Sequence, residues 1–464
     1  MKNTRREFLR LSGLAGLGLA NIGLLGAATT IESSAEESAR IRKTKKQKFN
    51  MSGFSAPKLE TVRIGFIGLG NRGPHAVNRM SNIEGVQITG ICDLRPERTD
   101  LVSKNLENTI HKPAVYSGSP DGWKEMCNRD DIDLIYIATP WSLHAPMAIY
   151  AMEHGKHAAV EVPSAVNLDE CWQMVETSER TRKHCQILEN CCYDFFELLT
   201  LNMARLGFFG EIVHGEGAYI HDLLDLNFSK KQYSQMWRLE ENSKRNGNLY
   251  PTHGLGPICQ VMDINRGDKM EYLVSMSSND FTMNNRAKEL AASDEFFKPF
   301  VDRPYRGNMN TTTIKTNKGR TIMIQHDVSS TRPYSRIHLV SGTKGAASKY
   351  PEPARIAINH NNWVSPEEYK ALEEKYNPDI VKKMGEIAKK IGGHGGMDFI
   401  MDWRLITNLR NGFPVDMDVY DAALWSAIFP LSEISTANRS KSIDVPDFTG
   451  GSWKTNKPVD LSVK

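Results

Sequence analysis

Residues 62–73 read VRIGFIGLGNRG, a short apolar run that leads directly into a glycine-rich turn. A strand followed at once by G-x-G-x-x-G is the pattern that binds a dinucleotide at the start of a helix. Gly68 permits the tight turn, Gly70 lets the backbone approach the pyrophosphate, and Gly73 allows the helix to pack closely. The positive end of that helix faces the phosphates. Many isolated glycine motifs are simple turns, so the surrounding sequence has to show whether this one binds a dinucleotide.

Strands and helices alternate after this turn. Apolar runs at 86–92, 134–138 and 156–162 predict strands, with helical stretches between them. This alternation predicts a parallel, doubly wound α/β sheet, the Rossmann arrangement. Asp93 ends the second strand, twenty residues after Gly73. A carboxylate there accepts hydrogen bonds from the ribose hydroxyls and repels a 2′-phosphate, which favours NAD, while Arg95 nearby leaves NADP open.

The second half of the chain has a different pattern. Residues from about 210 to 350 predict a mainly antiparallel open sheet, with a hairpin at Asn317-Lys318-Gly319. Residues 277–304 lack a clear period and predict a loop with a short helix. Two later stretches, 392–410 and 421–433, predict helices that pack back against the sheets. The fold class is therefore α/β, with a Rossmann domain followed by an α+β domain.

The N-terminus is typical of an export signal. Arg5-Arg6 precedes Phe8 and Leu9, as in a twin-arginine signal, and the following stretch 11–30 contains no acidic residue. A stable membrane span needs about 20 strongly apolar residues, and the glycines in this stretch make it less apolar than such a span. A chance Arg-Arg pair beside an amphipathic helix is the alternative. We expect twin-arginine export to the periplasm or the medium, a route that carries folded proteins, often with cofactor bound.

Composition is that of an ordinary soluble enzyme. Of the 464 residues, 40% are hydrophobic and 24% charged, and the net charge is only +3. No folded segment interleaves basic and aromatic residues as a nucleic-acid-binding domain would. The seven cysteines are odd in number and lack C-x-x-C, so neither a zinc knuckle nor a disulfide framework is indicated. The expected domains are a signal peptide (1–31), a linker (32–59), an NAD-binding Rossmann domain (60–165) and a substrate-binding α+β domain (166–464).

Three segments of the predicted Rossmann domain resemble the glucose-fructose oxidoreductase/inositol dehydrogenase/MocA family: ATPWSLH at 138–144, GKH at 155–157 and EVP at 161–163. Ordinary dehydrogenases of that family carry Glu-Lys-Pro where this chain has Glu161-Val162-Pro163. The family's lysine lies beside the nicotinamide and helps to move the hydroxyl proton during oxidation. Because valine cannot carry a proton, the difference argues against simple alcohol dehydrogenation.

Longer motifs are similar to glycoside hydrolase family 109. The resemblance covers nearly everything from residue 60 to the C-terminus. It implies an exo-acting, retaining α-N-acetylgalactosaminidase with tightly bound NAD, acting on terminal α-GalNAc of glycans or glycoconjugates. The motifs are LENCCY at 188–193, GEIVHGEG at 210–217, NGNLYPTHG at 246–254, MDINRG at 262–267, TRPY at 331–334, GHGGMD at 393–398 and IDVPDFT at 443–449.

The implied chemistry is redox-neutral. Hydride transfer from carbon 3 of the sugar to NAD makes a ketone and acidifies the carbon 2 proton. Loss of that proton expels the group at carbon 1, water adds, and the hydride returns, an exception to the usual carboxylate pair of glycosidases. Such a cofactor suits an exported enzyme, because no soluble dinucleotide pool is needed. The alternatives are an exported NAD(P)-dependent sugar oxidoreductase and a sugar sensor without turnover.

The resemblance also implies site residues. His253 is expected to act as acid/base with Tyr250 and Tyr193 assisting, and sequence does not fix their individual roles. Substrate contacts are implied for Tyr219, Tyr250, His253 and Tyr334. Cofactor contacts are implied for Gly68, Gly70, Asn71, Arg72, Gly73, Asp93, Trp141, His144, Glu161, Val162, Asn190, Trp237 and Arg238.

Structural alternatives remain for several of these residues. His253 beside a glycine can simply bond a backbone carbonyl, Tyr334 can be a packing aromatic, and His144 can cap its helix. His394 lies in a glycine-rich segment that is equally well read as a linking loop, and we assign it no role. His214, Glu216, His221 and Asp222 lack the partner spacing of a metal site, so no catalytic metal is expected. Oligomeric state stays open, although an exposed sheet face in this fold often pairs with another subunit.

Overall fold

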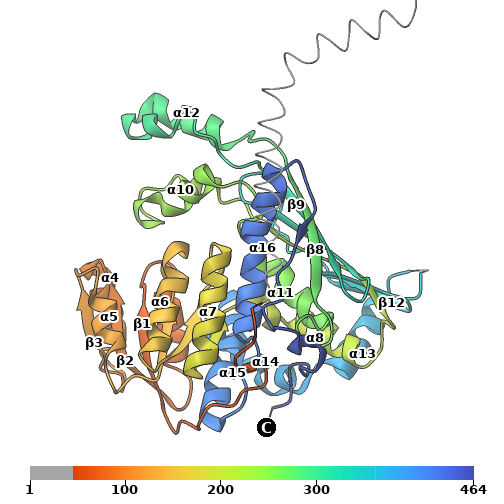
Figure 1. Cartoon of the computed structure of the whole chain (residues 1–464), viewed down its shortest axis with the longest axis horizontal. Helices are drawn as coiled ribbons and strands as arrows, with labels where there is room; N and C mark the ends of the chain where they lie inside the picture. Colours follow the sequence, from red (N-terminus) through yellow and green to blue (C-terminus); the bar gives the residue numbers. More distant parts are fainter. Residues whose placement is uncertain (1–44, 361, 464) are drawn as a thin grey trace, which may run out of the picture. The chain divides into compact units, whose positions relative to one another are not determined.

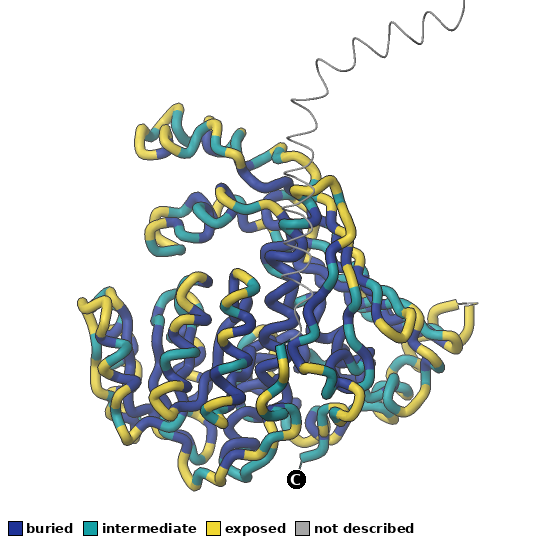
Figure 2. Tube along the Cα trace, in the orientation of Figure 1, coloured by how far each residue is buried: buried dark blue, intermediate teal, exposed yellow. Residues whose placement is uncertain are grey.

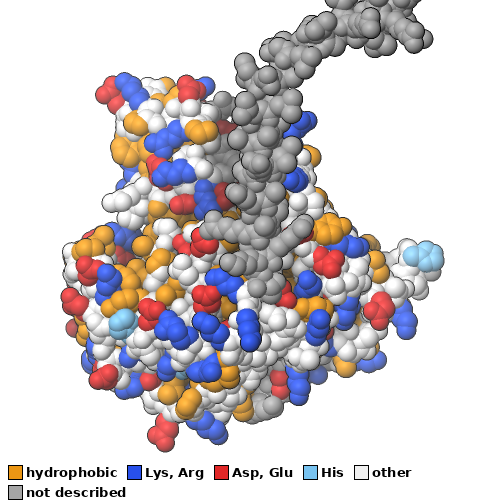
Figure 3. Space-filling model, in the orientation of Figure 1, with side chains coloured by type: hydrophobic (Ala, Val, Ile, Leu, Met, Phe, Trp, Pro, Cys, Tyr) orange, Lys and Arg blue, Asp and Glu red, His pale blue; other side chains and the backbone are white. Residues whose placement is uncertain are grey.

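The computed structural model describes residues 45–360 and 362–463. The predicted export signal and residues 32–44 of the predicted linker lie outside these residues. Within the described part of the chain, no helix is long and apolar enough to cross a membrane. On the face seen in Figure 3, basic and acidic side chains are interspersed, as expected for a net charge near zero.

The first sheet is the predicted parallel one. Its six strands run in the order β3-β2-β1-β4-β5-β6, and every neighbouring pair is parallel. The predicted domain end at residue 165 is too early, because β6 completes this sheet by pairing with β5. The strands are β1 (Val62–Ile67), β2 (Val86–Asp93), β3 (Ala114–Ser117), β4 (Leu134–Ile137), β5 (His157–Val160) and β6 (Cys185–Ile187).

Helices from both ends of the chain cover this sheet. The central strands β4 and β5 are buried throughout, as parallel strands covered on both faces are. The last helices, α15 and α16, contact α3, β1, α7 and β6, which confirms that they pack back against the sheets (Figure 1). Figure 2 shows α16 buried along most of its length. The helices are α3 (Gly73–Met80), α4 (Pro96–Leu106), α5 (Gly122–Cys127), α6 (Trp141–Glu153), α7 (Leu168–Thr181), α15 (Met397–Asn411) and α16 (Val419–Ala437).

The second sheet has eight strands in the order β13-β12-β11-β7-β10-β9-β8-β14. All neighbours are antiparallel except β7 and β10, which confirms the mainly antiparallel prediction. The hairpin predicted at Asn317–Gly319 joins β9 to β10, with Gly319 at φ +82°. The strands are β7 (Ile212–Ile220), β8 (Met270–Ser277), β9 (Asn310–Thr316), β10 (Thr321–Asp327), β11 (Leu339–Gly342), β12 (Gly345–Ser348), β13 (Arg355–Ile358) and β14 (Ile443–Asp444).

One face of the second sheet is covered, and the other is largely open. The helix α11 (Thr252–Val261) packs on β7, and α16 packs on β8. Burial alternates along β9 and β10, which is the pattern of a sheet with one buried face. Four further helices surround these elements: α8 (Phe195–Arg205), α13 (Pro366–Tyr376), α14 (Asp379–Ile391) and the 3-10 turn η1 (Asn190–Tyr193).

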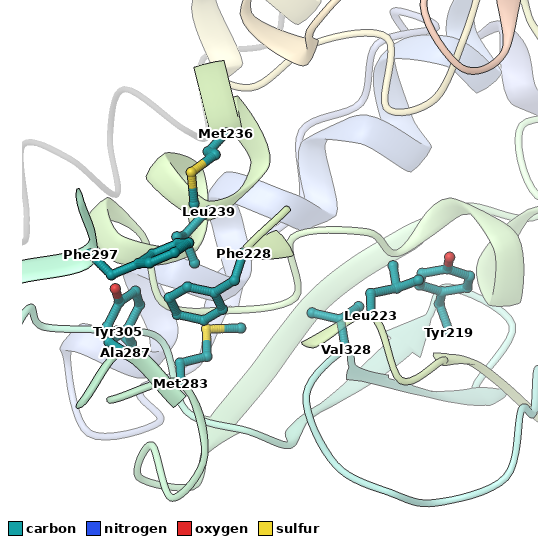
Figure 4. Packing of buried hydrophobic residues seen from close by; sticks show 10 residues of the cluster. All are labelled: Tyr219, Leu223, Phe228, Met236, Leu239, Met283, Ala287, Phe297, Tyr305 and Val328. Carbon is teal, nitrogen blue, oxygen red and sulfur yellow. The ribbon is translucent and has the colours of Figure 1, made fainter. Parts of the chain in front are cut away.

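An arm projects from the second sheet and has a small core of its own. It contains α9 (Leu224–Asn227), α10 (Trp237–Lys244), α12 (Met283–Ser293) and the 3-10 turn η3 (Glu295–Phe300). The 11-residue α12 is the short helix predicted within 277–304. Figure 4 shows Phe228, Met283, Phe297 and Tyr305 gathered around one another. The other members of the cluster are Met236, Leu239, Ala287, Leu223, Tyr219 and Val328. This packing fixes the start of α10, which carries Trp237 and Arg238.

Candidate active site

The glycine turn after β1 has the shape of a pyrophosphate cradle. Gly68 lies at φ +89°, and a Cβ there would lie 2.6 Å from the carbonyl oxygen of Ala138. A Cβ on Gly73 would lie 2.0 Å from the carbonyl oxygen of Gly68, so α3 can start here only with glycine. At Gly70 the nearest atom is 3.6 Å away, which leaves its backbone open. These residues therefore fit a dinucleotide.

Asp93 at the end of β2 completes the cradle. Its Oδ2 accepts a 2.7 Å hydrogen bond from the backbone N–H of Leu69, which ties strand end to turn. Its Oδ1 lies 3.3 Å from Nε of Arg95 in an ion pair. Because Arg95 is engaged by this carboxylate, it is not a free cation for a 2′-phosphate. The geometry therefore favours NAD through Asp93.

Arg72 joins the turn to the residues after β5 and β6. Its Nε donates to Glu161 at 3.1 Å, and its Nη1 donates to Asp398 of α15 at 3.3 Å. The side-chain amide of Asn190 donates to the other oxygen of Asp398. The structure thus brings Arg72, Glu161 and Asn190 together, and Val162 lies buried beside Glu161. Asn71 is exposed on the turn itself.

His144 holds two loops together. Its Nδ1 lies 2.7 Å from the carbonyl oxygen of Pro163, and its Nε2 lies 2.7 Å from that of Thr139. Both ring nitrogens are therefore taken by the backbone. The predicted cofactor contact stays a prediction, and the observed contacts position the loops that carry Trp141 and Val162.

An aromatic cage surrounds Arg238. The ring centroid of Trp141 lies 5.2 Å from Trp237 and 5.7 Å from Tyr250, and the Arg238 guanidinium carbon lies 5.1 Å from the rings of Trp141 and Tyr250. Arg238 is only 7% exposed, yet its Nε and Nη2 have no hydrogen-bond partner among the described residues. Buried donors without partners are costly, so this cage suits a ligand that carries oxygen acceptors.

The predicted substrate residues converge next to this cage. The ring of Tyr219 lies 4.7 Å from Tyr250, 5.2 Å from His253 and 6.4 Å from Tyr334. The rings of Tyr250 and His253 are 4.9 Å apart. These four side chains come from β7, the start of α11 with the residues just before it, and the segment after β10, so only the folded chain brings them together.

A close crossing of α11 over β7 creates this arrangement. A Cβ on Gly254 would lie 2.2 Å from the backbone nitrogen of Ala218, and one on Gly217 would lie 2.2 Å from the carbonyl oxygen of Gly254. Neither position can hold a side chain without moving backbone. Glycine at both therefore lets the start of α11 rest on the strand and places His253 beside Tyr219.

Glu189 holds His253 in place, and the sequence analysis did not identify it as a site residue. His253 Nδ1 lies 2.8 Å from Glu189 Oε1, and the carboxylate also accepts from the backbone N–H of Cys191 at 3.1 Å. A carboxylate can only accept, so Nδ1 carries the proton and Nε2 keeps its lone pair. Burial raises the pKa of Glu189, but its interaction with His253 outweighs burial and holds that pKa below its usual value. The only sequence signal was its place in the LENCCY motif.

Three groups here could in principle hold a metal ion. Glu189, Cys191 and His253 offer ligand atoms that lie within 4.8 Å of one another. Each is already hydrogen-bonded, Cys191 to the side-chain oxygen of Asn190 at 3.6 Å. The absence of a catalytic metal stays a prediction.

Tyr193 lies in a different network. Its hydroxyl donates to Asp416 at 2.9 Å, and Asp416 also accepts from Nε of Arg404 at 2.8 Å. No described contact joins the Tyr193 hydroxyl to Tyr250 or His253. Because Asp416 takes the single phenolic proton, the contacts support a structural role rather than the expected assistance in proton transfer.

His394 also borders the site, although the sequence analysis assigned it no role. Its Nδ1 lies 2.9 Å from Asp398 Oδ2, the same oxygen that Arg72 contacts. Its glycine-rich neighbours in GHGGMD were the available signal. The segment before α15 therefore belongs to the cofactor side of the site.

The chain has a parallel dinucleotide-binding sheet and a second, mainly antiparallel sheet, with a site of Tyr, His and Arg where they meet. This arrangement defines an enzyme with the NAD-binding oxidoreductase fold. Residues 62–188 match the family described as "Oxidoreductase family, NAD-binding Rossmann fold". Among solved structures, the NAD binding oxidoreductase from Klebsiella pneumoniae has a TM-score of 0.64 at 16% identity, over 84% of this chain and 100% of that one. That likeness shows the fold.

The second half of the chain shows to which enzyme family the protein belongs. Residues 193–455 match "Glycosyl hydrolase 109, C-terminal domain". The chain is 51% identical over 421 residues to "Glycosyl hydrolase family 109 protein 1" of Bacteroides fragilis (strain YCH46), covering 87% of this chain and 89% of the relative. It is 50% identical over 410 residues to "Alpha-N-acetylgalactosaminidase" of Bacteroides fragilis (strain ATCC 25285), covering 87% and 95%. The chain belongs to glycoside hydrolase family 109, which confirms the resemblance seen in the sequence.

Proposed function

We propose that this glycoside hydrolase releases terminal α-linked N-acetylgalactosamine from glycans or glycoconjugates, with NAD as a resident cofactor. The relative named Alpha-N-acetylgalactosaminidase supports the substrate. The observation that carries the chemistry is the pair of Glu189 and His253, 2.8 Å apart, with the His253 ring 4.9 Å from that of Tyr250. It supplies an oriented proton acceptor next to the place where the cofactor is expected.

The residues near the turn would hold the cofactor. Gly68, Gly70 and Gly73 would bind its pyrophosphate through the backbone, and Asp93 would bind the ribose hydroxyls. NAD, when bound, supplies the hydride acceptor that turns carbon 3 of the sugar into a ketone and acidifies the proton on carbon 2, and it later returns the hydride. Val162 offers no proton carrier where related dehydrogenases have lysine, so proton transfer falls to other side chains.

His253 and Tyr250 would divide the proton transfers. The Nδ1–H of His253 is held by Glu189, so its Nε2 lone pair can take the carbon 2 proton. Burial raises the pKa of Tyr250 well above its usual value and outweighs the lowering effect of Arg238. The phenol therefore stays protonated and can donate to the oxyanion that develops on the sugar.

The test uses 4-nitrophenyl α-N-acetylgalactosaminide with the purified full chain and no added NAD. We expect 4-nitrophenol release without net NADH absorbance, and solvent deuterium at carbon 2 of the released sugar. Steady accumulation of NADH would instead support the exported sugar oxidoreductase. The variant His253→Gln is the matched control, because it should retain the cofactor but lose both hydrolysis and deuterium incorporation.

We also propose that the protein is exported by the twin-arginine route to the periplasm or the medium, with NAD already bound. The support is the Arg5-Arg6 signal followed by a weakly apolar, glycine-interrupted stretch. Cell fractionation tests this: the double change Arg5→Lys, Arg6→Lys should leave the enzyme inside the cell, fully active and carrying NAD. Export of that variant would contradict the proposal.

The open face of the second sheet supports a homo-oligomer. Tyr272, Val274 and Met276 alternate along β8 and are all exposed on this face. We propose that two subunits pair through it, since a row of exposed apolar side chains on a sheet favours association. Light scattering after size exclusion should give a dimer or larger for the wild type and a smaller species for Val274→Lys.

A further inference from the structure

A polar hollow lies away from the active site, where three helices meet the last residues of the chain. It is lined by the end of α8, the end of α13, the start of α14 and residues 459–462 (Figure 1). Its volume of about 380 Å³ is in the range of small-molecule sites. The other end of α14 leads into the segment before α15, which borders the active site. Because α14 has 13 residues, its two ends are about 20 Å apart, and the hollow is a separate site.

Three basic side chains line the hollow: Arg205 of α8, Lys375 of α13 and Lys382 of α14. Among the described residues, none of the three forms an ion pair with a carboxylate. Burial lowers the pKa of Arg205, and the carboxylates around it do not offset that effect. The positive end of the α14 dipole adds to the charge of these side chains. The hollow therefore attracts an anion.

Buried polar atoms in the wall of the hollow lack partners. Arg205 donates from Nη1 to the carbonyl of Val459 at 2.6 Å, but its Nε has no hydrogen-bond partner among the described residues. The same is true of Asn377 Oδ1 and Ser462 Oγ. Buried polar atoms are normally hydrogen-bonded. Three such atoms around one hollow therefore indicate a ligand that supplies both acceptors and donors.

The acidic side chains of the hollow distinguish a bare anion from a larger ligand. Asp379 and Asp460 line it together with the three basic side chains. A bare sulfate would meet these carboxylates as like charges, and it has no hydrogen to donate to Asn377 Oδ1. A sugar with one acidic group places its charge against the basic side chains and its hydroxyls against the acceptors. Pro378 and Leu461 supply an apolar wall for the C–H groups of the sugar ring.

We propose that this hollow binds an acidic sugar, one that carries a carboxylate or a sulfate ester. The binding site itself does not depend on the proposed function, but its use does. An acidic sugar bound here belongs to another part of the glycoconjugate than the terminal α-linked N-acetylgalactosamine. Holding it keeps the glycoconjugate on the enzyme and raises the effective concentration of terminal sugars at the active site.

Titration calorimetry at low salt tests the binding site, with glucuronate and glucose 6-sulfate as probes and the purified full chain as receptor. We expect both acidic sugars to bind, and glucose and inorganic sulfate to bind at least about 10-fold more weakly, because each lacks one set of contacts. The double change Lys375→Gln, Lys382→Gln should weaken both acidic probes by about 10-fold or more. Both lysines are exposed, so the fold should be kept.

The matched control is Lys390→Gln, which removes an equal charge from the other end of α14 and should bind both probes like the wild type. Arg205→Gln is a second test, since it removes the guanidinium and leaves both lysines in place, and it should also weaken both probes. Equal affinity in the wild type and the double variant would overturn the proposal. Inorganic sulfate binding as tightly as glucose 6-sulfate would overturn the assignment to a sugar.

Kinetics tests the use of the site. On a sulfated glycoprotein with terminal α-linked N-acetylgalactosamine, the double lysine variant should show a higher KM than the wild type. On the 4-nitrophenyl glycoside, which has no acidic sugar, KM and kcat should be unchanged. An unchanged KM on the glycoprotein would overturn the role in holding the substrate. A wild type inactive on both substrates would overturn the proposed function and leave the binding result standing.

Discussion

A single buried carboxylate decides which nitrogen of His253 carries the proton. Glu189 is 0% exposed and accepts from Nδ1. The change Glu189→Gln keeps the shape of the side chain but lets its amide donate, which favours the tautomer with the proton on Nε2. We expect kcat to fall by about 10²- to 10⁴-fold, as for loss of a positioned general base. Steady-state kinetics on the 4-nitrophenyl glycoside measures this, and an unchanged kcat with normal cofactor content would rule out the pair.

A second residue-level prediction concerns the choice of dinucleotide. Asp93 holds Arg95 in an ion pair beside the open backbone of Gly70. Removing the carboxylate in Asp93→Ser frees the guanidinium for a 2′-phosphate and removes the repelling charge. The dinucleotide extracted from purified protein should therefore shift from NAD towards NADP. Adding Arg95→Ala should cancel that shift; NADP retained in the double variant would contradict the role given to Arg95.

Residues with motif neighbours could be predicted from the sequence, but those defined by a distant contact could not. Tyr250 and His253 lie in one motif and do meet in the structure. Glu189 lies in the LENCCY motif, but only its contact with His253, 64 positions away, shows that it orients that histidine. Tyr193 lies in the same motif, and its hydroxyl donates to Asp416, a distant contact that no local pattern reveals, so its assistance in proton transfer stays a prediction.

At the level of elements, the site depends on how closely α11 approaches β7. The carbonyl of Gly254 lies where a Cβ of Gly217 would stand, and a Cβ of Gly254 would strike the backbone of the same strand. Since backbone must move to accept it, Gly254→Ala should cost about 1–3 kcal/mol of stability. The displaced start of α11 would also carry His253 away from Glu189 and Tyr219.

Thermal unfolding and kinetics together test this prediction. Gly254→Ala should lower both the thermal midpoint and kcat. Gly155→Ala is the matched control, because nothing lies within 4 Å of a Cβ there, although its φ of +79° adds local backbone strain. A Gly254 variant with normal midpoint and normal kcat would show that the close crossing is not needed.

Periodicity predicted the regular elements, and its absence predicted the irregular arm. The parallel strands and the β9–β10 hairpin have buried runs and turn residues that are visible locally. The loop with a short helix predicted at 277–304 is confirmed, and this stretch shows little apolar period because α12 buries only Met283 and Ala287. Its order comes from contacts with Phe228, Phe297 and Tyr305, which no local pattern reveals.

At the level of the whole molecule, the last helices of the chain pack against the parallel sheet and helices formed by its first half. The predicted split into a Rossmann domain and a separate substrate domain underestimates this, since α15 contacts α3 and β1 while α16 contacts α7 and β6. Asp398 of α15 accepts from Arg72 and lies 3.4 Å from Nη1 of Arg79, both from the region of the glycine turn. α15 is therefore tied to the region of the glycine turn, and we expect a variant there to affect cofactor binding and stability together.

Asp398 also gives this connection a defined pH dependence. Burial raises its pKa, but the hydrogen bond from His394 and the charges of Arg72 and Arg79 hold that pKa well below its usual value of 3.8. The folded state thus binds this proton more weakly than the unfolded chain, so the carboxylate stabilises the fold above about pH 4 and the contribution is lost as pH falls further. Because Asp398 is only 1% exposed, Asp398→Asn takes one charged partner from the buried Arg79 and from Arg72 and should cost about 3–5 kcal/mol at pH 7.

Thermal midpoints of wild type and Asp398→Asn between pH 3 and pH 7 test the sign. The gap should be widest at pH 7 and narrow below about pH 4, where protonation starts to remove the same charge from the wild type. The variant should also lose bound NAD more readily on dilution, since Arg72 and Asn190 both depend on this carboxylate. Glu386→Gln, which removes the exposed partner of Lys389, should change the midpoint little at any pH. A gap that stays constant or widens in acid would mean that Asp398 does not stabilise the fold as a charged group, and that α15 is held to the glycine turn by packing alone.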